Sequence, residues 1–160
     1  MAQVIITDQR VVSAGWAAWG RTVAIGAVTG IIFWLLTLLI AHYVVEPLTC
    51  RQIVDASMCT NATPLAGTIA TILAAVIAIG LMIRLRIARP IITAVATAAL
   101  LWNLASWTAG LFWLEALGWS VLLYLLTFAL FGWITRYITL WVTIVLSLLI
   151  VVVLRIALIL

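Results

Sequence analysis

The chain has 160 residues, of which 68% are hydrophobic and 8% charged, and its mean hydropathy is +1.39. This composition excludes a water-soluble globular domain, in which about 25% of the residues are usually charged. The net charge of +4 comes from eight arginines and four acids. Because most of these arginines lie beside long apolar runs, they indicate membrane orientation rather than nucleic-acid binding.

Five apolar runs of about bilayer-crossing length predict an all-α, polytopic integral membrane helical bundle. The runs are continuously apolar and do not alternate with period two, which disfavours a β-barrel. We expect residues 1–21 to form a cytoplasmic or interfacial segment and residues 22–160 the transmembrane domain. Its helices are expected at about 22–45, 65–83, 91–114, 118–134 and 138–160, with an extracytoplasmic loop at 46–64. No proline or loop-like stretch marks the end of the fourth segment, so a re-entrant fourth segment is an alternative.

The turn that contains Arg84, Arg86 and Arg89 fixes the expected orientation. Three arginines in six residues are costly in hydrocarbon, and the positive-inside tendency assigns them to the cytoplasm. Five crossings then give a cytoplasmic N-terminus in a multi-pass protein of the cytoplasmic (inner) membrane. In this topology the arginines gather inside, except Arg51 and Arg155, and most acids lie outside: Glu46, Asp55 and Glu115.

Small residues at helical spacing predict close helix packing in the first two helices. Gly26 and Gly30 form a GxxxG pair, which lets another backbone approach closely, either within the chain or in a second copy. Ala70, Ala74 and Ala78 recur every four residues and form a similar seam in the second helix.

The third predicted helix carries the only strongly polar side chain expected near mid-membrane, Asn103. With three- and four-residue spacing, it shares one face with smaller residues: Ala96, Ala99, Ser106 and Gly110. Because an amide in lipid is costly, we expect this face to pack against protein. The favoured interpretation is that Asn103 joins two helices, and the alternative is a substrate contact in a cavity.

Cys50 and Cys59 both fall in the predicted extracytoplasmic loop. Two cysteines nine residues apart on an oxidising face predict a structural disulfide. The alternative is a redox pair, as in quinone-linked thiol oxidoreductases. Those enzymes use a Cys-x-x-Cys motif, and the spacing here is far wider.

Arg155 interrupts the otherwise apolar last helix. It follows the hydroxyl residues Thr143 and Ser147, about two helical turns beyond the second of them. Five apolar residues follow it, so the helix continues in the membrane and a buried partner for the guanidinium is expected. Glu115 is the favoured partner because its turn lies on the same side, and Glu46 is the second choice.

The sequence contains no recognisable nucleophile–base constellation and no phosphate-binding glycine loop. His42 is the single histidine, so bis-histidine haem or a histidine-rich metal site is not expected, and no cofactor is predicted. His42 and Glu46, four residues apart, could pair if the first helix extends that far.

These features predict a small non-catalytic membrane subunit or accessory protein, rather than an enzyme, in a complex with other membrane proteins. Its expected partners are the lipid bilayer and other membrane proteins or further copies of itself, without nucleic acid. One alternative is a small oligomeric transporter or channel with its pathway along the Asn103 face. The other is a membrane thiol oxidoreductase that uses Cys50 and Cys59.

Overall fold

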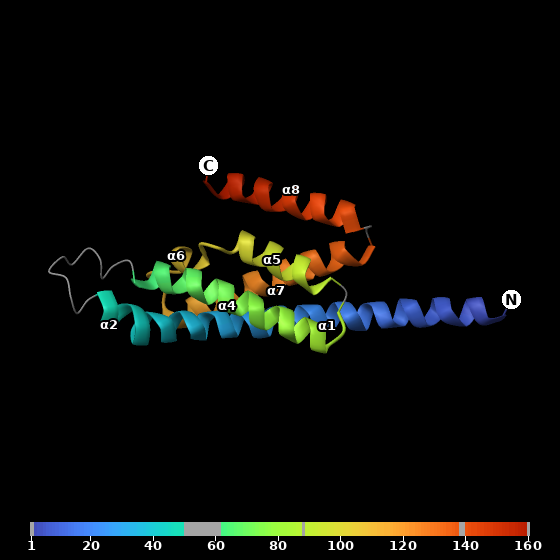
Figure 1. The fold of residues 1–160 in the computed structure, drawn as a ribbon, viewed down its shortest axis with the longest axis horizontal. Coiled ribbons are helices and arrows are strands. Elements are labelled where there is room, and N and C mark those ends of the chain that lie inside the picture. The colour runs from blue at the N-terminus through green and yellow to red at the C-terminus, as the bar shows by residue number, and fades with distance from the viewer. Residues whose placement is uncertain (1, 50–61, 88, 138–139, 160) are drawn as a thin grey trace.

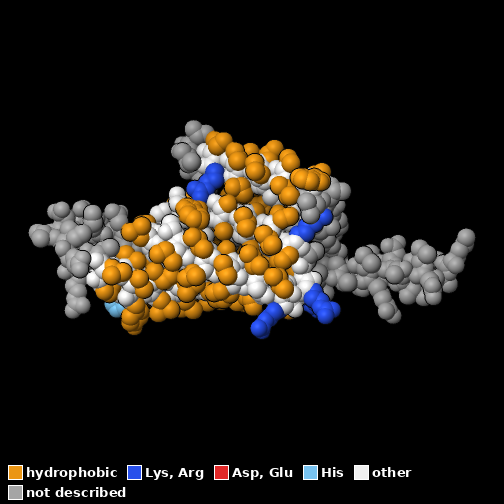
Figure 2. All heavy atoms as spheres, in the orientation of Figure 1, with side chains coloured by type: hydrophobic (Ala, Val, Ile, Leu, Met, Phe, Trp, Pro, Cys, Tyr) orange, Lys and Arg blue, Asp and Glu red, His pale blue; other side chains and the backbone are white. Residues whose placement is uncertain are grey.

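The computed structural model describes residues 2–49, 62–87, 89–137 and 140–159, and every regular element within these ranges is a helix. Four helical segments are long and apolar enough to cross a membrane: Trp19–Leu48, Thr63–Arg84, Pro90–Trp107 and Trp113–Thr135. A shorter apolar helix covers Trp141–Ala157. The protein is therefore an all-α polytopic membrane bundle, and hydrophobic side chains cover most of the face seen in Figure 2.

The bundle is built around α1 (Ala2–Ile40), which continues through the π-helix η1 (Ala41–Val45) into α2 (Glu46–Thr49). α1 packs against α4 (Ala62–Arg84) and α7 (Trp113–Tyr137), while α5 (Pro90–Leu100) packs against α4 and α7. α8 (Leu140–Ile159) lies on the outside, against α5 and α7 (Figure 1). Successive spans run in opposite directions, so the α4–α5 turn lies toward the N-terminal end of the bundle and α2 toward the other end (Figure 1).

Gly26 and Gly30 lie where α1 crosses α7. A β-carbon added at Gly30 would be 2.7 Å from the α-carbon of Val121, and one added at Gly26 would be 2.8 Å from the β-carbon of Phe128. The two glycines therefore allow a backbone approach that any side chain would prevent. The contact lies within one chain, which is the first of the two arrangements expected for this motif.

The alanine seam of α4 is the most completely buried surface of the bundle. Ala70, Ala74 and Ala78 are all 0% exposed. They belong to a core that also contains Phe33 of α1 and Tyr124 of α7. The seam thus lies at the centre of the bundle, where small side chains let neighbouring helices approach closely.

The arginine turn closes α4 by hydrogen bonds of the Schellman type. The amide of Ile87 donates to the Met82 carbonyl, and the amide of Arg86 donates to the Ile83 carbonyl, both at 3.0 Å. Arg86 has a left-handed backbone conformation with φ of 53°, at the position that usually holds glycine. Pro90 then opens α5, a position at which its missing N–H costs nothing.

The third predicted helix, 91–114, differs from the structure because it is interrupted. α5 ends at Leu100, and a short helix α6 (Leu104–Trp107) follows after a gap of three residues. Between them the hydrogen bonding changes, since the amide of Leu104 donates to the carbonyl three residues back, that of Leu101. The chain then turns at Gly110, whose φ is +91°, and α7 begins at Trp113. α7 is one continuous helix of 25 residues, so the fourth segment crosses the bundle instead of re-entering it.

Candidate functional site

The break in the third span is stabilised by a long-range contact from α8. The last carbonyls of a helix have no partner within the helix, and α5 ends inside the apolar part of the bundle. Arg155 supplies a partner, because its Nη2 and Nε atoms donate to the Ala99 carbonyl oxygen at 3.0 Å and 3.3 Å. The positive guanidinium therefore lies at the negative end of the α5 dipole.

This contact corrects the predicted ion pair between Arg155 and Glu115. Within the part of the chain that the structure describes, the guanidinium binds a backbone carbonyl and makes no ion pair with Glu115. Glu115 is exposed in the first turn of α7. A helix C-terminus offers a partial negative charge without a carboxylate, which removes the need for an acidic partner.

The break also divides the small-residue face that was predicted for a continuous third helix. Ala96 is buried and Ala99 is partly buried, as expected of a packed face. The three remaining members are all exposed: Asn103, Ser106 and Gly110. Within this chain the face is therefore not a single helix contact, because residues beyond Leu100 no longer follow the helical spacing. The Asn103 side chain is exposed on the surface of a span, and the Ser106 hydroxyl donates to the Asn103 carbonyl at 2.7 Å.

A second polar group lies at the far end of α1. His42 Nδ1 and the Glu46 carboxylate are 3.0 Å apart, so the pair expected from their four-residue spacing is present. The intervening residues form the π-helix η1, a distortion that is often found at functional sites. The His42 and Tyr43 rings meet edge to face, with centroids 5.1 Å apart. Because both members of the ion pair are well exposed, it contributes little to stability.

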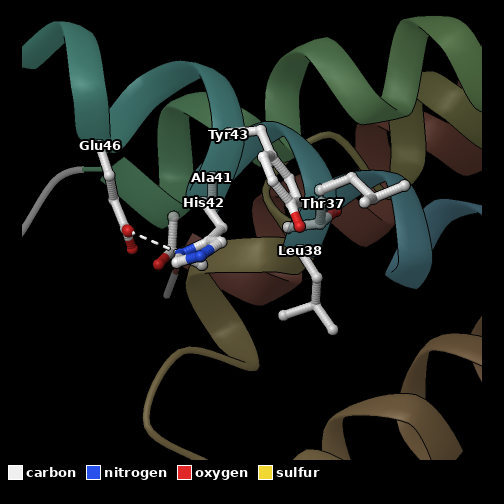
Figure 3. A pocket seen from close by; sticks show the side chains of 8 residues that line it. Thr37, Leu38, Ala41, His42, Tyr43 and Glu46 are labelled. Carbon is white, nitrogen blue, oxygen red and sulfur yellow. Dashed lines mark hydrogen bonds and ion pairs between the residues drawn. The ribbon is translucent and has the colours of Figure 1, made fainter.

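His42 and Glu46 lie at the edge of an open cavity of about 460 Å³ (Figure 3). A second cavity, of about 240 Å³, adjoins it and is lined by Trp113 and Gly110. The two cavities share wall residues from α1 and α4: Thr37, Leu38 and Thr63. This end of the bundle can therefore accept small polar groups at its surface. Among the described residues, the imidazole and the carboxylate have no third histidine, cysteine or acidic side chain beside them that would complete a metal site.

Among the described residues, no three histidine, cysteine or acidic side chains come together as metal ligands. Cys50 and Cys59 lie outside the described residues, so their predicted disulfide stays a prediction. No protein-family model matches the chain, and no curated protein or solved structure matches it.

Sequence reasoning missed two of the features that define this site. The interruption after Leu100 contains no proline or glycine from which it could be predicted. The Ala99 carbonyl is a backbone group, so no residue type marks it as the partner of Arg155. The one available signal was Asn103, because a strongly polar residue in a membrane segment often marks a functional site.

Proposed function

We propose that the chain is a non-catalytic membrane subunit that packs against larger membrane proteins. The observation that carries this proposal is the exposed Asn103 side chain beside the break in the third span. A carboxamide that faces lipid loses its hydrogen bonds with water and gains none in return, which is costly. A helix of another protein could supply those hydrogen bonds and cover the interrupted backbone.

The depth of Asn103 supports the proposal. It follows Pro90 by 13 residues, counting from 90 to 103. At 1.5 Å per helical residue this corresponds to roughly 20 Å from the arginine end of the span, within a hydrocarbon core about 30 Å thick. With Pro90 at the inner boundary of the hydrocarbon, the amide would lie below the outer headgroups, where snorkelling by so short a side chain cannot reach water.

We further propose that the protein lies in the cytoplasmic membrane with its N-terminus inside. Support comes from the separation of charge along the bundle. Arg84 and Arg86 are exposed in the turn at one end, whereas Glu46 and Glu115 are exposed at the other. An arginine-rich turn on one side is typical of the cytoplasmic face.

Site-specific photocrosslinking in native membranes would test the subunit proposal. A photoreactive residue at Asn103 should crosslink to one larger membrane protein. The same residue at Leu126, which is exposed on α7, should react mainly with lipid. Lipid adducts alone at both positions would contradict the proposal.

A small oligomeric transporter is the second candidate, because interrupted spans are typical of substrate sites in transporters. The centre of one chain is filled by buried side chains, including Tyr124 and Phe128. A pathway would therefore have to run between copies. Crosslinks from Asn103 to a second copy of this chain, without a larger partner, would favour this function over the subunit.

A further inference from the structure

α8 is held against α5 at two points, with an apolar groove between them. At the arginine end, Arg89 Nη1 donates to the Thr143 hydroxyl at 2.9 Å. Toward the other end, Arg155 binds the Ala99 carbonyl. The groove between these contacts has a volume of about 410 Å³ and is open at the outer surface of the bundle. Its walls are almost wholly aliphatic, and they include Val95, Ala96, Leu148, Val151 and Val152.

One polar side chain lines this groove. Ser147 is 4% exposed, and its hydroxyl has no hydrogen-bond partner among the described residues. In membrane helices a serine hydroxyl commonly bonds to its own helix, as Ser120 does with the Ala116 carbonyl at 2.7 Å. An unsatisfied buried hydroxyl is costly, and because Ser147 lines the groove, rotation of its hydroxyl toward the groove would let a bound molecule supply the missing acceptor.

The geometry points to a binding site for one anionic glycerophospholipid in the groove between α5 and α8. Its phosphate lies at Arg89, the ester carbonyl of one chain accepts a hydrogen bond from Ser147, and that acyl chain runs along the groove toward Arg155. Ser147 follows Thr143 by four residues, or about 6 Å along the helix, and an ester lies similarly far below its phosphate. The spacing of the charge and the hydroxyl therefore matches one lipid molecule.

The charges favour an anionic lipid over a zwitterionic one. Arg89 lies at one end of the groove, where it reaches Thr143 of α8, and Arg84 and Arg86 of the same turn are exposed and add positive charge to this end of the bundle. Basic pockets between membrane helices are typical binding sites for anionic headgroups. The narrow aliphatic walls suit a single flexible acyl chain better than the broad face of another helix.

Lipid binding to the purified full chain in an uncharged detergent would test this site. The probes are dioleoyl phosphatidylglycerol and dioleoyl phosphatidylcholine, titrated separately and followed by native mass spectrometry and by the thermal unfolding midpoint. We expect the anionic lipid to bind about fivefold or more tightly than the zwitterionic one, since each arginine contributes about that factor. Equal binding of the two lipids would overturn the proposal.

Two variants locate the lipid, each with a matched control. Arg89→Gln should abolish the preference for phosphatidylglycerol, whereas Arg84→Gln in the last turn of α4 should retain most of it. Ser147→Ala should weaken both lipids by about fivefold, the value of one hydrogen bond, and leave the headgroup preference intact. Ser120→Ala, which alters a buried serine outside the groove, should not change binding.

Ser147→Ala tests the lipid site even if Arg89→Gln fails to fold. The hydroxyl that it removes has no partner among the described residues, so the variant loses no internal hydrogen bond. Unchanged binding of both lipids to Ser147→Ala would show that no ester lies in the groove and would overturn the assignment.

Discussion

The Arg155 guanidinium closes the C-terminal end of α5 by donating two hydrogen bonds to the Ala99 carbonyl oxygen. The two residues are 56 positions apart in the chain, and no acidic group takes part in the contact. A charged side chain in one apolar helix is thus matched by the dipole of a neighbouring helix, which explains how α8 tolerates the arginine and how the third span tolerates its interruption.

Arg155→Met should destabilise the protein by about 1.5–3 kcal/mol, the usual value of hydrogen bonds to a charged group. Reversible unfolding in mixed micelles would measure the change. Glu115→Gln should alter stability by less than about 0.5 kcal/mol, because exposed substitutions away from contacts have small effects. The effects of the two substitutions should add. A strong coupling energy in the double variant would instead indicate that Arg155 and Glu115 form an ion pair.

Gly30→Ala should destabilise the bundle by about 1–3 kcal/mol, because overpacking at a close contact forces the backbone to move. The added β-carbon would lie 2.7 Å from the Val121 α-carbon and 2.9 Å from the Ser120 carbonyl oxygen, and neither group can rotate away. Gly80→Ala is the control, since no atom of the described residues lies within 4 Å of its added carbon. That variant should be stabilised by up to about 1 kcal/mol through helix propensity, and a similar loss in both variants would contradict the assigned contact.

Arg86→Gly should stabilise the protein by about 1 kcal/mol. Arg86 has a φ of 53°, a conformation that costs an ordinary residue about 1–2 kcal/mol and costs glycine nothing. Arg84→Gly, in the last turn of α4, should instead destabilise the helix by about 1 kcal/mol. Thermal unfolding midpoints of the two variants should therefore move in opposite directions.

The two ends of the bundle should lie on opposite sides of the membrane. Single cysteines at Leu85 and Glu115, in a background with Cys50 and Cys59 replaced by serine, test this with a membrane-impermeant thiol reagent. Both positions are exposed, so labelling reports the side and not the burial. Glu115→Cys should react in intact cells and Leu85→Cys only after lysis; reaction of both from the same side would exclude the five-crossing topology.

If Cys50 and Cys59 form the predicted disulfide, reduction should lower the mobility of the chain in gel electrophoresis. Neither thiol should be alkylated before reduction. Replacing both residues with serine should cost about 2–4 kcal/mol of stability, the usual value for closing a loop. The abundance of the proposed complex should fall with stability. A complex that assembles fully but loses an associated redox activity would instead favour the thiol oxidoreductase.

Periodicity in the sequence predicted the parts of the fold that rest on repeated side chains. The alanine seam is buried because residues four apart share a helix face, and His42 meets Glu46 for the same reason. The interruption after Leu100 could not be predicted, because its free Ala99 carbonyl depends on a donor, Arg155, that reaches it only when α8 packs on α5. Tertiary contacts of this kind override local helix propensity.

The contact between α1 and α7 has a consequence for biosynthesis. The surface that receives Gly26 and Gly30 includes Val121 and Phe128, which leave the ribosome about ninety to one hundred residues later. Until the fourth span has been synthesised and inserted, the glycine face of the first span must therefore contact lipid or an insertion factor. Since α8 emerges after the other described helices and packs on α5 and α7, it docks after they have assembled. A nascent chain stopped before Val121 would consequently be the form most exposed to membrane quality control.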